Sequence, residues 1–462
     1  MKKIAKFLIV LGMMGQLSSC DYLDIVPDER AQESDTWKTE GAVRGYLYSC
    51  YGYLPANRTF GNSYWLAEEL TAVTKELFTT FKYGYYSPVS LGFTSNTWST
   101  IWNGIHQCYM FQESLKQVSN EYVTDEMKKQ YLAESNFLIA YYHFLSMRSY
   151  GPTMIIRSVI DLETPISGFP ERSSIDEVVA FINEKLDEAM SEGGLPTTWS
   201  GKDYGRATRL AALALKSRVY LYAASPLYNG NTEMYADFRS PLDGRQLIAQ
   251  EKSQAKWEIS ATQTKYAIDE VEKAKFHLYH DADAGEPSDA KPGLPNKAQR
   301  RLRYTNIDNQ TGNNPEIIWA DTRNDDYYGI QRRCPPRQTL GGKFAGISMT
   351  NCPTLQTIEA FYTKNGLPIN KDKTFDYDER YEYISAPENC DGNNYEDLVK
   401  YANFTPSSDK VMRLCTDREP RFYAWTTYHN GYFEFGKYNN EEISADPAKR
   451  AIRIHLLRDD PH

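Results

Sequence analysis

The sequence lacks the short motifs that mark most enzyme classes. It contains no GxSxG nucleophile elbow, no HExxH zinc motif, no phosphate-binding P-loop and no GxGxxG dinucleotide fingerprint. Its 61 acidic residues guarantee that some pair of carboxylates lies at the separation that glycosidases use, so their number cannot support a hydrolase. We therefore predict no catalytic residue and keep a hydrolase only as the weakest of three hypotheses.

Metal-binding patterns are equally scarce. The chain has only seven histidines, and none of its seven cysteines lies in a CxxC spacing. The stretch HLYHDAD at 277–283 brings two histidines close to two aspartates. The calcium-loop template D-x-D-x-x-G fails there, because Glu286 stands where the template needs glycine. We predict no metal ion and no cofactor.

An excess of positive charge is missing as well, since the formal net charge is −9 at pH 7. An acidic chain argues against nucleic acid as a partner and against a basic surface that holds anionic lipid. Beyond residue 19, no hydrophobic run approaches the roughly 18 residues that a membrane-spanning helix requires. The sequence therefore predicts a soluble body after that point.

The first twenty residues differ sharply from the rest. Three lysines precede a short hydrophobic run at 7–17, and Leu-Ser-Ser leads to Cys20. This order is typical of a secretory signal, and the last four residues resemble a bacterial lipobox, in which the cysteine is acylated and becomes the mature N-terminus. The alternative is a plain signal peptide with a chance cysteine. Cleavage after residue 19 removes three lysines, so the charge goes from −9 to −12 over 443 residues (462 minus 19).

The six cysteines beyond Cys20 leave their pairing open. Export permits disulfides, and six cysteines allow fifteen pairings. The alternative is that most of them are free and buried. They are Cys50, Cys108, Cys334, Cys352, Cys390 and Cys415.

Hydrophobic periodicity and capping residues predict helices through the first part of the mature chain. Ser34 or Asp35 is the expected cap of the first helix, and Ser174 with Glu177 forms a capping box. The expected helices run from the first cap to 51, then over 98–115, 124–150, 174–189, 208–224 and 257–275. After about 276 the chain is rich in turn signals, with strand-like pieces at 316–320 and 428–435.

This pattern predicts a mainly α fold: a tetratricopeptide-like helical scaffold with an irregular, loop-rich ligand-binding lobe that contains short strands. We expect three regions: a lipoprotein signal peptide at 1–19, a helical region at 20–275 and the loop-rich region at 276–462.

Several stretches together resemble the SusD/RagB family of outer-membrane lipoproteins of Bacteroidota. Beside the lipobox and its acidic continuation CDYLD (20–24), they are LAESNFLIAYYHFLSMRSYGP (132–152), RSSIDEVVAFINEKLDEA (172–189), GRATRLAALALKSRVYLYAASPLY (205–228), NNPEIIWA (313–320), PTLQTIEAFYTKNGLPI (353–369) and DREPRFYAWTTYHNGY (417–432). The resemblance implies a non-enzymatic protein that faces the cell exterior and is held in the outer membrane by lipid on Cys20. It also implies an oligosaccharide ligand and a TonB-dependent outer-membrane transporter (SusC-like) as partner. The family pattern continues well beyond residue 462, so the chain looks short at its C-terminus.

Two aromatic clusters supply the candidate ligand residues. Tyr and Trp (35 and 8 residues) outnumber Phe (19), and such rings offer broad faces with a polar handle for sugar CH groups. In the first cluster, at 78–102, the family resemblance favours Trp98, with Asn96 beside it. In the second, at 319–333, we expect Trp319 and Tyr327 to stack on ligand and Arg323 and Asn324 to bind hydroxyls. Most tyrosines are expected to pack at helix edges, and the second cluster is as compatible with a solvated loop of internal ion pairs.

The leading hypothesis is thus a surface glycan-binding lipoprotein. The second keeps the anchor and scaffold but binds peptide or host glycoprotein, which should depend on Arg332 and Arg333 and survive the loss of Trp98.

Overall fold

The computed structural model describes residues 37–55, 69–72, 94–161, 163–280, 297–307, 314–323, 351–385, 410–429, 432–434 and 451–453. Several predicted features lie outside these residues: the signal and Cys20, residues 78–93 of the first aromatic cluster, Asn324, Tyr327, the arginines at 332–333, and two of the six cysteines. Asn96 lies in a helix, but its side chain is also outside the description.

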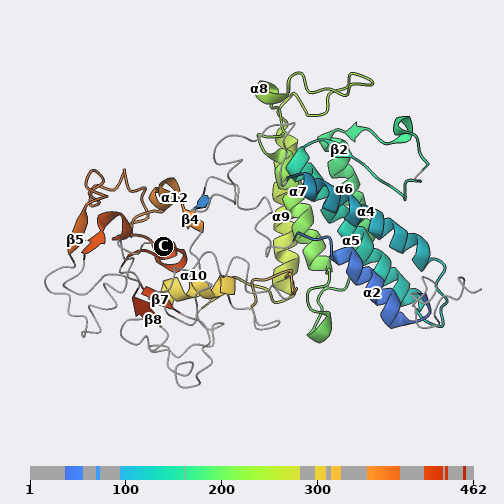
Figure 1. The fold of residues 1–462 in the computed structure, drawn as a ribbon, viewed down its shortest axis with the longest axis horizontal. Coiled ribbons are helices and arrows are strands. Elements are labelled where there is room, and N and C mark those ends of the chain that lie inside the picture. Colours follow the sequence, from blue (N-terminus) through green and yellow to red (C-terminus); the bar gives the residue numbers. More distant parts are fainter. Residues whose placement is uncertain are drawn as a thin grey trace, which may run out of the picture.

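Six long helices form an array in which consecutive helices pack side by side (Figure 1). They are α2 (Glu40–Tyr51), α4 (Thr94–Leu115), α5 (Asp125–Tyr150), α6 (Ile175–Ala189), α7 (Arg209–Ala224) and α9 (Gln254–Lys273). Helix α5 packs on α4 and α6, α7 packs on α6 and α9, and α2 packs against both α4 and α5. The mainly α prediction is confirmed.

Local capping chemistry explains where most of these helices begin. The Thr124 hydroxyl accepts from Met127 N at the start of α5, and Thr208 accepts from Ala211 N at the start of α7. Ser174 and Glu177 form the predicted capping box of α6. The predicted cap of the first helix is wrong, because Thr39, rather than Ser34 or Asp35, caps α2.

The core of the array is centred on α5, most of whose side chains are buried. Close contact between α4 and α5 depends on Gly104, where an added Cβ would lie 2.8 Å from the Tyr142 ring. Tyr142 in turn donates from its hydroxyl to Cys50 O of α2 at 2.5 Å. Cys50 and Cys108 are buried in this core as free thiols, and Cys352 and Cys415 are free as well.

The second part of the described chain is made of short elements. Its helices are α10 (Lys297–Ile307), α12 (Leu355–Ala360) and α14 (Pro420–Trp425), and α10 packs on α14. Its antiparallel strand pairs are β5 (Tyr383–Ser385) with β6 (Lys410–Met412) and β7 (Tyr432–Glu434) with β8 (Ala451–Arg453). A small hydrophobic core of its own is formed by Ile369, Phe375 and Leu414.

Two further strand pairs complete the described elements. β1 (Leu70–Ala72) pairs with β4 (Asn351–Pro353), and β2 (Thr153–Met154) pairs with β3 (Arg172–Ser173). The short helices are α8 (Thr232–Tyr235) and three 3₁₀ turns, at Ile166–Gly168, Gly201–Asp203 and Arg413–Cys415. The strand predicted at 316–320 is wrong, because that segment makes turns and bends, whereas the one predicted at 428–435 is confirmed only for β7.

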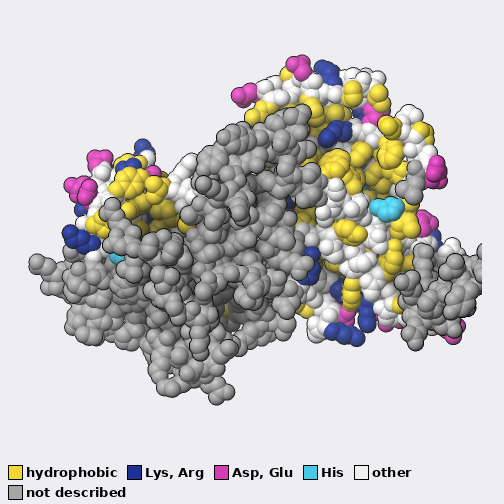
Figure 2. Space-filling model, in the orientation of Figure 1, with side chains coloured by type: hydrophobic (Ala, Val, Ile, Leu, Met, Phe, Trp, Pro, Cys, Tyr) yellow, Lys and Arg dark blue, Asp and Glu magenta, His cyan; other side chains and the backbone are white. Residues whose placement is uncertain are grey.

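Within the described residues no helix combines the length and the hydropathy needed to cross a bilayer. Hydrophobic side chains are nevertheless exposed over the visible face of the array, below the loop that carries α8 (Figure 2). Met234 of α8 is 70% exposed.

Candidate ligand-binding cavity

Residues 314–323, named the strap here, contact α10 at one end and the helical array along the rest of their length. Asn314 donates from its side-chain amide to Thr305 O of α10 at 3.0 Å. Further along the strap, Ile318 packs against the cluster formed by α7, α9 and Phe276. The strap therefore fixes α10 to the helices that precede it.

Trp319 is the central side chain of the strap. Its indole N–H donates to Gly205 O at 2.8 Å, and its ring lies edge-on to Phe137 and Tyr141 of α5, at centroid distances of 5.1 and 5.4 Å. It is partly buried against the main core. Trp319 thus serves both as packing for the strap and as a wall of the cavities described below.

Gly205 lets the strap approach this closely. Its φ of +99° lies in the region that favours glycine, and an added Cβ would meet Thr322 atoms at 2.8 Å and Ala320 O at 3.3 Å. The glycine that opens the sequence GRAT at 205–208 therefore leaves room for the strap backbone that passes over it.

Arg323 fastens the other end of the strap to the segment that follows α2. Its two terminal nitrogens donate to Leu54 O and Pro55 O, both at 2.9 Å, and its Nε donates to Asp321 Oδ1 at 2.8 Å. The Leu54 and Pro55 carbonyls lie 269 and 268 residues earlier in the sequence, respectively. The guanidinium is thereby held in one orientation at the cavity wall.

A buried ionic network lies beneath the strap. Glu134 of α5 is completely buried; it accepts from Arg206 Nη2 at 2.5 Å and from the Tyr51 hydroxyl at 2.6 Å. Tyr51 in turn accepts from Ala207 N at 2.9 Å, and Arg206 also donates to Asp203 at 2.8 Å. The carboxylate and the guanidinium are therefore hydrogen-bonded as well as paired, as a buried charge requires.

Burial dominates the electrostatics of this network. It raises the pKa of the Glu134 carboxyl, against the hydrogen bond and charge of Arg206, which lower that pKa. Burial, together with the charge of Glu134, also raises the pKa of the Tyr51 phenol. The Arg206 guanidinium lies over the Trp199 ring, 4.0 Å from its centroid, which adds a cation–π contact.

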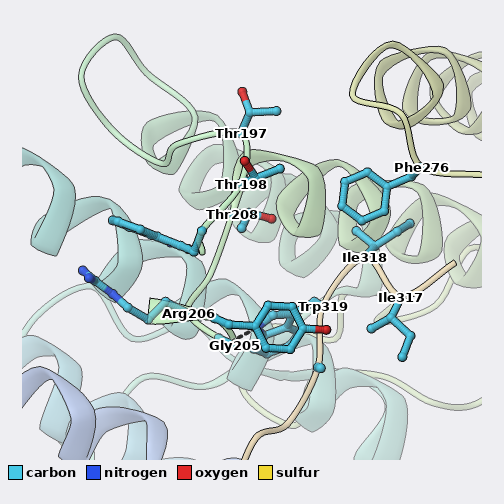
Figure 3. A pocket seen from close by; sticks show the side chains of 12 residues that line it. Thr197, Thr198, Gly205, Arg206, Thr208, Phe276, Ile317, Ile318 and Trp319 are labelled. Atoms are coloured by element: carbon cyan, nitrogen blue, oxygen red, sulfur yellow. Dashed lines mark hydrogen bonds between the residues drawn. The ribbon is translucent and has the colours of Figure 1, made fainter. Parts of the chain in front are cut away.

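Trp319 lies in the walls of three cavities that described residues line. The largest has a volume of about 690 Å³, the second about 440 Å³ and the smallest about 40 Å³. Figure 3 looks onto the smallest, with Thr197, Thr198 and Thr208 along one side and strap residues along the other. Tyr141 and Arg218 line both larger cavities, so these two spaces adjoin.

The largest cavity combines aromatic rings with hydrogen-bond donors. Its described walls come from α2, α5, α7, the 201–206 segment and the strap, and they include Tyr48, Tyr51, Tyr141, Tyr204, Trp319, Arg148, Lys202, Arg206, Arg218 and Arg323. A volume of several hundred Å³ with apolar faces and a few fixed polar groups is typical of a small-molecule site. Among the described residues, no three His, Cys, Asp or Glu side chains gather as a metal site would need.

The structure brings two of the predicted ligand residues together and places a third elsewhere. Trp319 and Arg323 line the largest cavity, while Trp98 packs edge-on against Trp102 and Tyr150, at centroid distances of 5.2 and 4.9 Å. Trp98 lines none of the three cavities, and the Arg172 guanidinium lies 5.9 Å from its ring. Its stacking on ligand stays a prediction, as do the roles of Asn96, Asn324 and Tyr327.

Sequence reasoning missed several side chains of the cavity. Tyr141 and Arg148 lie seven residues apart on α5 and so share a helix face, and Tyr48 lies three residues before Tyr51 on α2. That spacing shows which residues share a face but not which face meets the strap. Arg218 had no local signal at all.

Comparisons with known proteins cover most of the chain. A family model described as "Starch-binding associating with outer membrane" matches residues 21–221, and the model of the SusD family matches residues 315–452. No curated protein matches the sequence.

Solved structures resemble the chain along much of its length. The structure of a protein named BT4246 is 29% identical with a TM-score of 0.66, over 86% of this chain and 66% of its own. A SusD-like protein (BF3747) from Bacteroides fragilis is 18% identical with a TM-score of 0.59, over 92% of this chain and 65% of its own. The second likeness concerns the fold alone. This chain spans about two thirds of the length of both proteins.

Proposed function

Because this chain belongs to the SusD/RagB family, we propose that it is a cell-surface protein that binds oligosaccharides and passes them to a TonB-dependent transporter of the outer membrane. It acts by binding rather than by catalysis. The observation that carries the proposal is the cavity of about 690 Å³ beside Trp319, in a chain of this family.

The walls of this cavity suit a sugar. Sugar rings present flat CH faces that stack on aromatic planes, and hydroxyls that need fixed polar partners. Tyr48 is 41% exposed at the cavity, so its ring is open to solvent. Arg323 is already held in place by Leu54 and Pro55, so a ligand would meet a preorganised donor group there.

Calorimetry and affinity gels against a panel of polysaccharides test the binding. We expect retardation by at least one glycan, and a loss of about tenfold in affinity for Tyr48→Ala, since a stacked ring contributes on the order of 1 kcal/mol or more. Tyr122→Ala removes a tyrosine of similar exposure (37%) that lines none of the cavities, and should bind like the parent. Folded protein that no glycan retards would end the proposal.

The membrane anchor is proposed from the lipobox at 17–20. Two or three acyl chains hold a protein on a bilayer far more firmly than one, at about 0.8 kcal/mol per buried CH2. Mass spectrometry of the membrane fraction should find acyl groups on Cys20. A Cys20→Ala variant that remains in that fraction would contradict the anchor.

The transporter partnership has its own test. Full-length protein extracted gently from outer membranes should copurify with a TonB-dependent barrel, and the barrel gene is expected beside this one. Isolation of the protein alone under conditions that preserve other membrane complexes would argue against the partnership.

A further inference from the structure

The largest cavity carries more positive charge than the chain around it. Its described walls include Arg148, Lys202, Arg206, Arg218 and Arg323, and a single carboxylate, Asp321. Glu134 and Asp203 pair with Arg206 from behind the wall. Among the described residues, five cations against three carboxylates leave a net charge of +2, in a chain whose formal charge is −9.

The cations differ in how firmly they are held. Arg206 and Arg323 are fixed by Glu134, Asp203, Asp321 and backbone carbonyls, so they are oriented before any ligand arrives. Lys202 and Arg218 are exposed, and neither forms an ion pair or hydrogen bond with another described residue. These two side chains are therefore available to bind a ligand anion.

We propose that this cavity selects acidic oligosaccharides, whose sugar rings carry carboxylate or sulfate groups, and that Lys202 and Arg218 bind these groups. The inference rests on the proposed function and names its ligand class. Arg218 lines both adjoining cavities, so it lies where a chain of sugars could extend from one into the other.

Physical chemistry favours an acidic sugar over a neutral one here. A cationic cavity within an acidic protein concentrates anions locally while the rest of the surface repels them. Guanidinium groups form paired, charge-assisted hydrogen bonds with carboxylate and sulfate oxygens, which are roughly twice as strong as neutral ones. The aromatic walls favour a sugar over a peptide of the same charge, because they offer faces for ring stacking.

The test compares ligands that differ only in charge. Free and methyl-esterified oligogalacturonate form the carboxylate pair, and sulfated and desulfated galactan form the sulfate pair. Titration calorimetry with the full chain should give at least tenfold tighter binding for the charged member of one pair. That preference should shrink as salt is raised, because screening weakens exposed charge interactions.

Variants identify the side chains responsible. Arg218→Gln and Lys202→Gln should each weaken binding of the charged glycan about tenfold and leave the uncharged partner unchanged. Lys373→Gln removes an exposed cation that lines none of the cavities and should have no effect. Melting temperatures equal to the parent's exclude loss of fold, since neither cavity residue has a described partner to lose.

The remaining outcomes would contradict the acidic preference, the recognition of sugars or the proposed function. If a neutral glycan binds and its charged counterpart binds no tighter, the acidic preference is wrong and the proposed function stands. If poly-L-glutamate binds as tightly as the acidic glycan, the cavity recognises acidic peptides instead. If no glycan binds at all, the proposed function fails and this inference fails with it.

Discussion

At the scale of single residues, His143 shows how burial in the helical array keeps an ionisable side chain neutral. It is completely buried on α5, with its ring 4.7 Å from Phe181 and 6.0 Å from Trp102. Its Nδ1 lies 2.7 Å from Ile139 O, and Ile156 N donates to its Nε2. Burial lowers the pKa of His143 to about 4, so the ring is neutral at pH 7.

This lowered pKa predicts a loss of stability in mild acid. The unfolded chain binds a proton at its ordinary pKa of about 6.5, whereas the folded chain resists it until about pH 4. Stability from this residue is therefore present above pH 6.5 and falls as the pH drops, by about 3 kcal/mol at pH 4. Urea unfolding of the parent and of His143→Gln, from pH 7 to pH 4, measures the difference.

Between pH 7 and pH 4, the free energy of unfolding should fall by about 3 kcal/mol less in His143→Gln than in the parent, because the glutamine side chain is neutral throughout. His106→Gln changes an exposed histidine on α4 and should keep the parent's dependence. If the free energy of unfolding changes with pH equally in the parent and in His143→Gln, then His143 binds a proton equally well in the folded and the unfolded chain, and the prediction is wrong.

Trp319 shows the limit of residue-level reasoning from sequence. Its place in an aromatic and polar stretch predicts a ligand contact, and the structure does place it at a cavity. Its hydrogen bond to Gly205 and its packing on Phe137 could not be foreseen, because both partners lie more than a hundred residues away.

At the scale of elements, the strap depends on one glycine. Gly205→Ala combines an unfavourable φ of +99° with a Cβ that would touch Thr322 at 2.8 Å. We expect a loss of about 2–3 kcal/mol, since strain at such a backbone position is on the order of 1–3 kcal/mol. Hydrogen exchange of the strap amides should accelerate more than that of α5.

A matched control separates backbone strain at a positive φ from the contact between the added Cβ and the strap. Gly201 also has a positive φ, +59°, but nothing lies within 4 Å of its added Cβ. Gly201→Ala should therefore carry backbone strain alone and leave strap exchange unchanged. Equal effects of the two variants on the strap would mean that its close approach to Gly205 is not what holds it.

Elements differ in how well the sequence predicts them. The starts of α5, α6 and α7 follow from Thr124, Ser174 and Thr208, because a capping side chain acts within three residues of itself. The strap was predicted in part as a strand, because its hydrophobic run EIIWA fits a strand as well as a packed turn. What decides between them is the distant array on which it packs.

At the scale of the whole molecule, the described residues contain separate hydrophobic cores. The large one belongs to the helical array, and a small one, formed by Ile369, Phe375 and Leu414, belongs to the second part. Leu414→Ala should cost about 2–5 kcal/mol, as is usual for a buried leucine, and the loss should be confined to the second part.

Hydrogen exchange measured peptide by peptide shows whether the loss of stability is confined to the second part of the chain. Amides of 362–375 and 410–425 should exchange faster in Leu414→Ala, while those of α5 keep their parent rates. Leu138→Ala, in the core of the array, should show the reverse pattern. Faster exchange of α5 in Leu414→Ala would show that the two cores unfold as one unit.

Net charge is a property of the whole chain and hides local detail. The value of −9 is the basis for predicting no nucleic-acid partner, yet it gave no sign of the cationic cavity. The arginines and the lysine that form it are scattered from 148 to 323, and only folding brings them together.

The bonds from Arg323 to Leu54 and Pro55 also set an order of assembly. When a chain is delivered N-terminus first, all the helices of the array, through Lys273, are available before residue 323 exists outside the ribosome or translocation channel. The carbonyls of Leu54 and Pro55, just after α2, must then stay open to water until the strap arrives to close over them. The cavity is therefore completed late, and a chain interrupted before residue 323 would have the helical array without the complete cavity wall that the strap supplies.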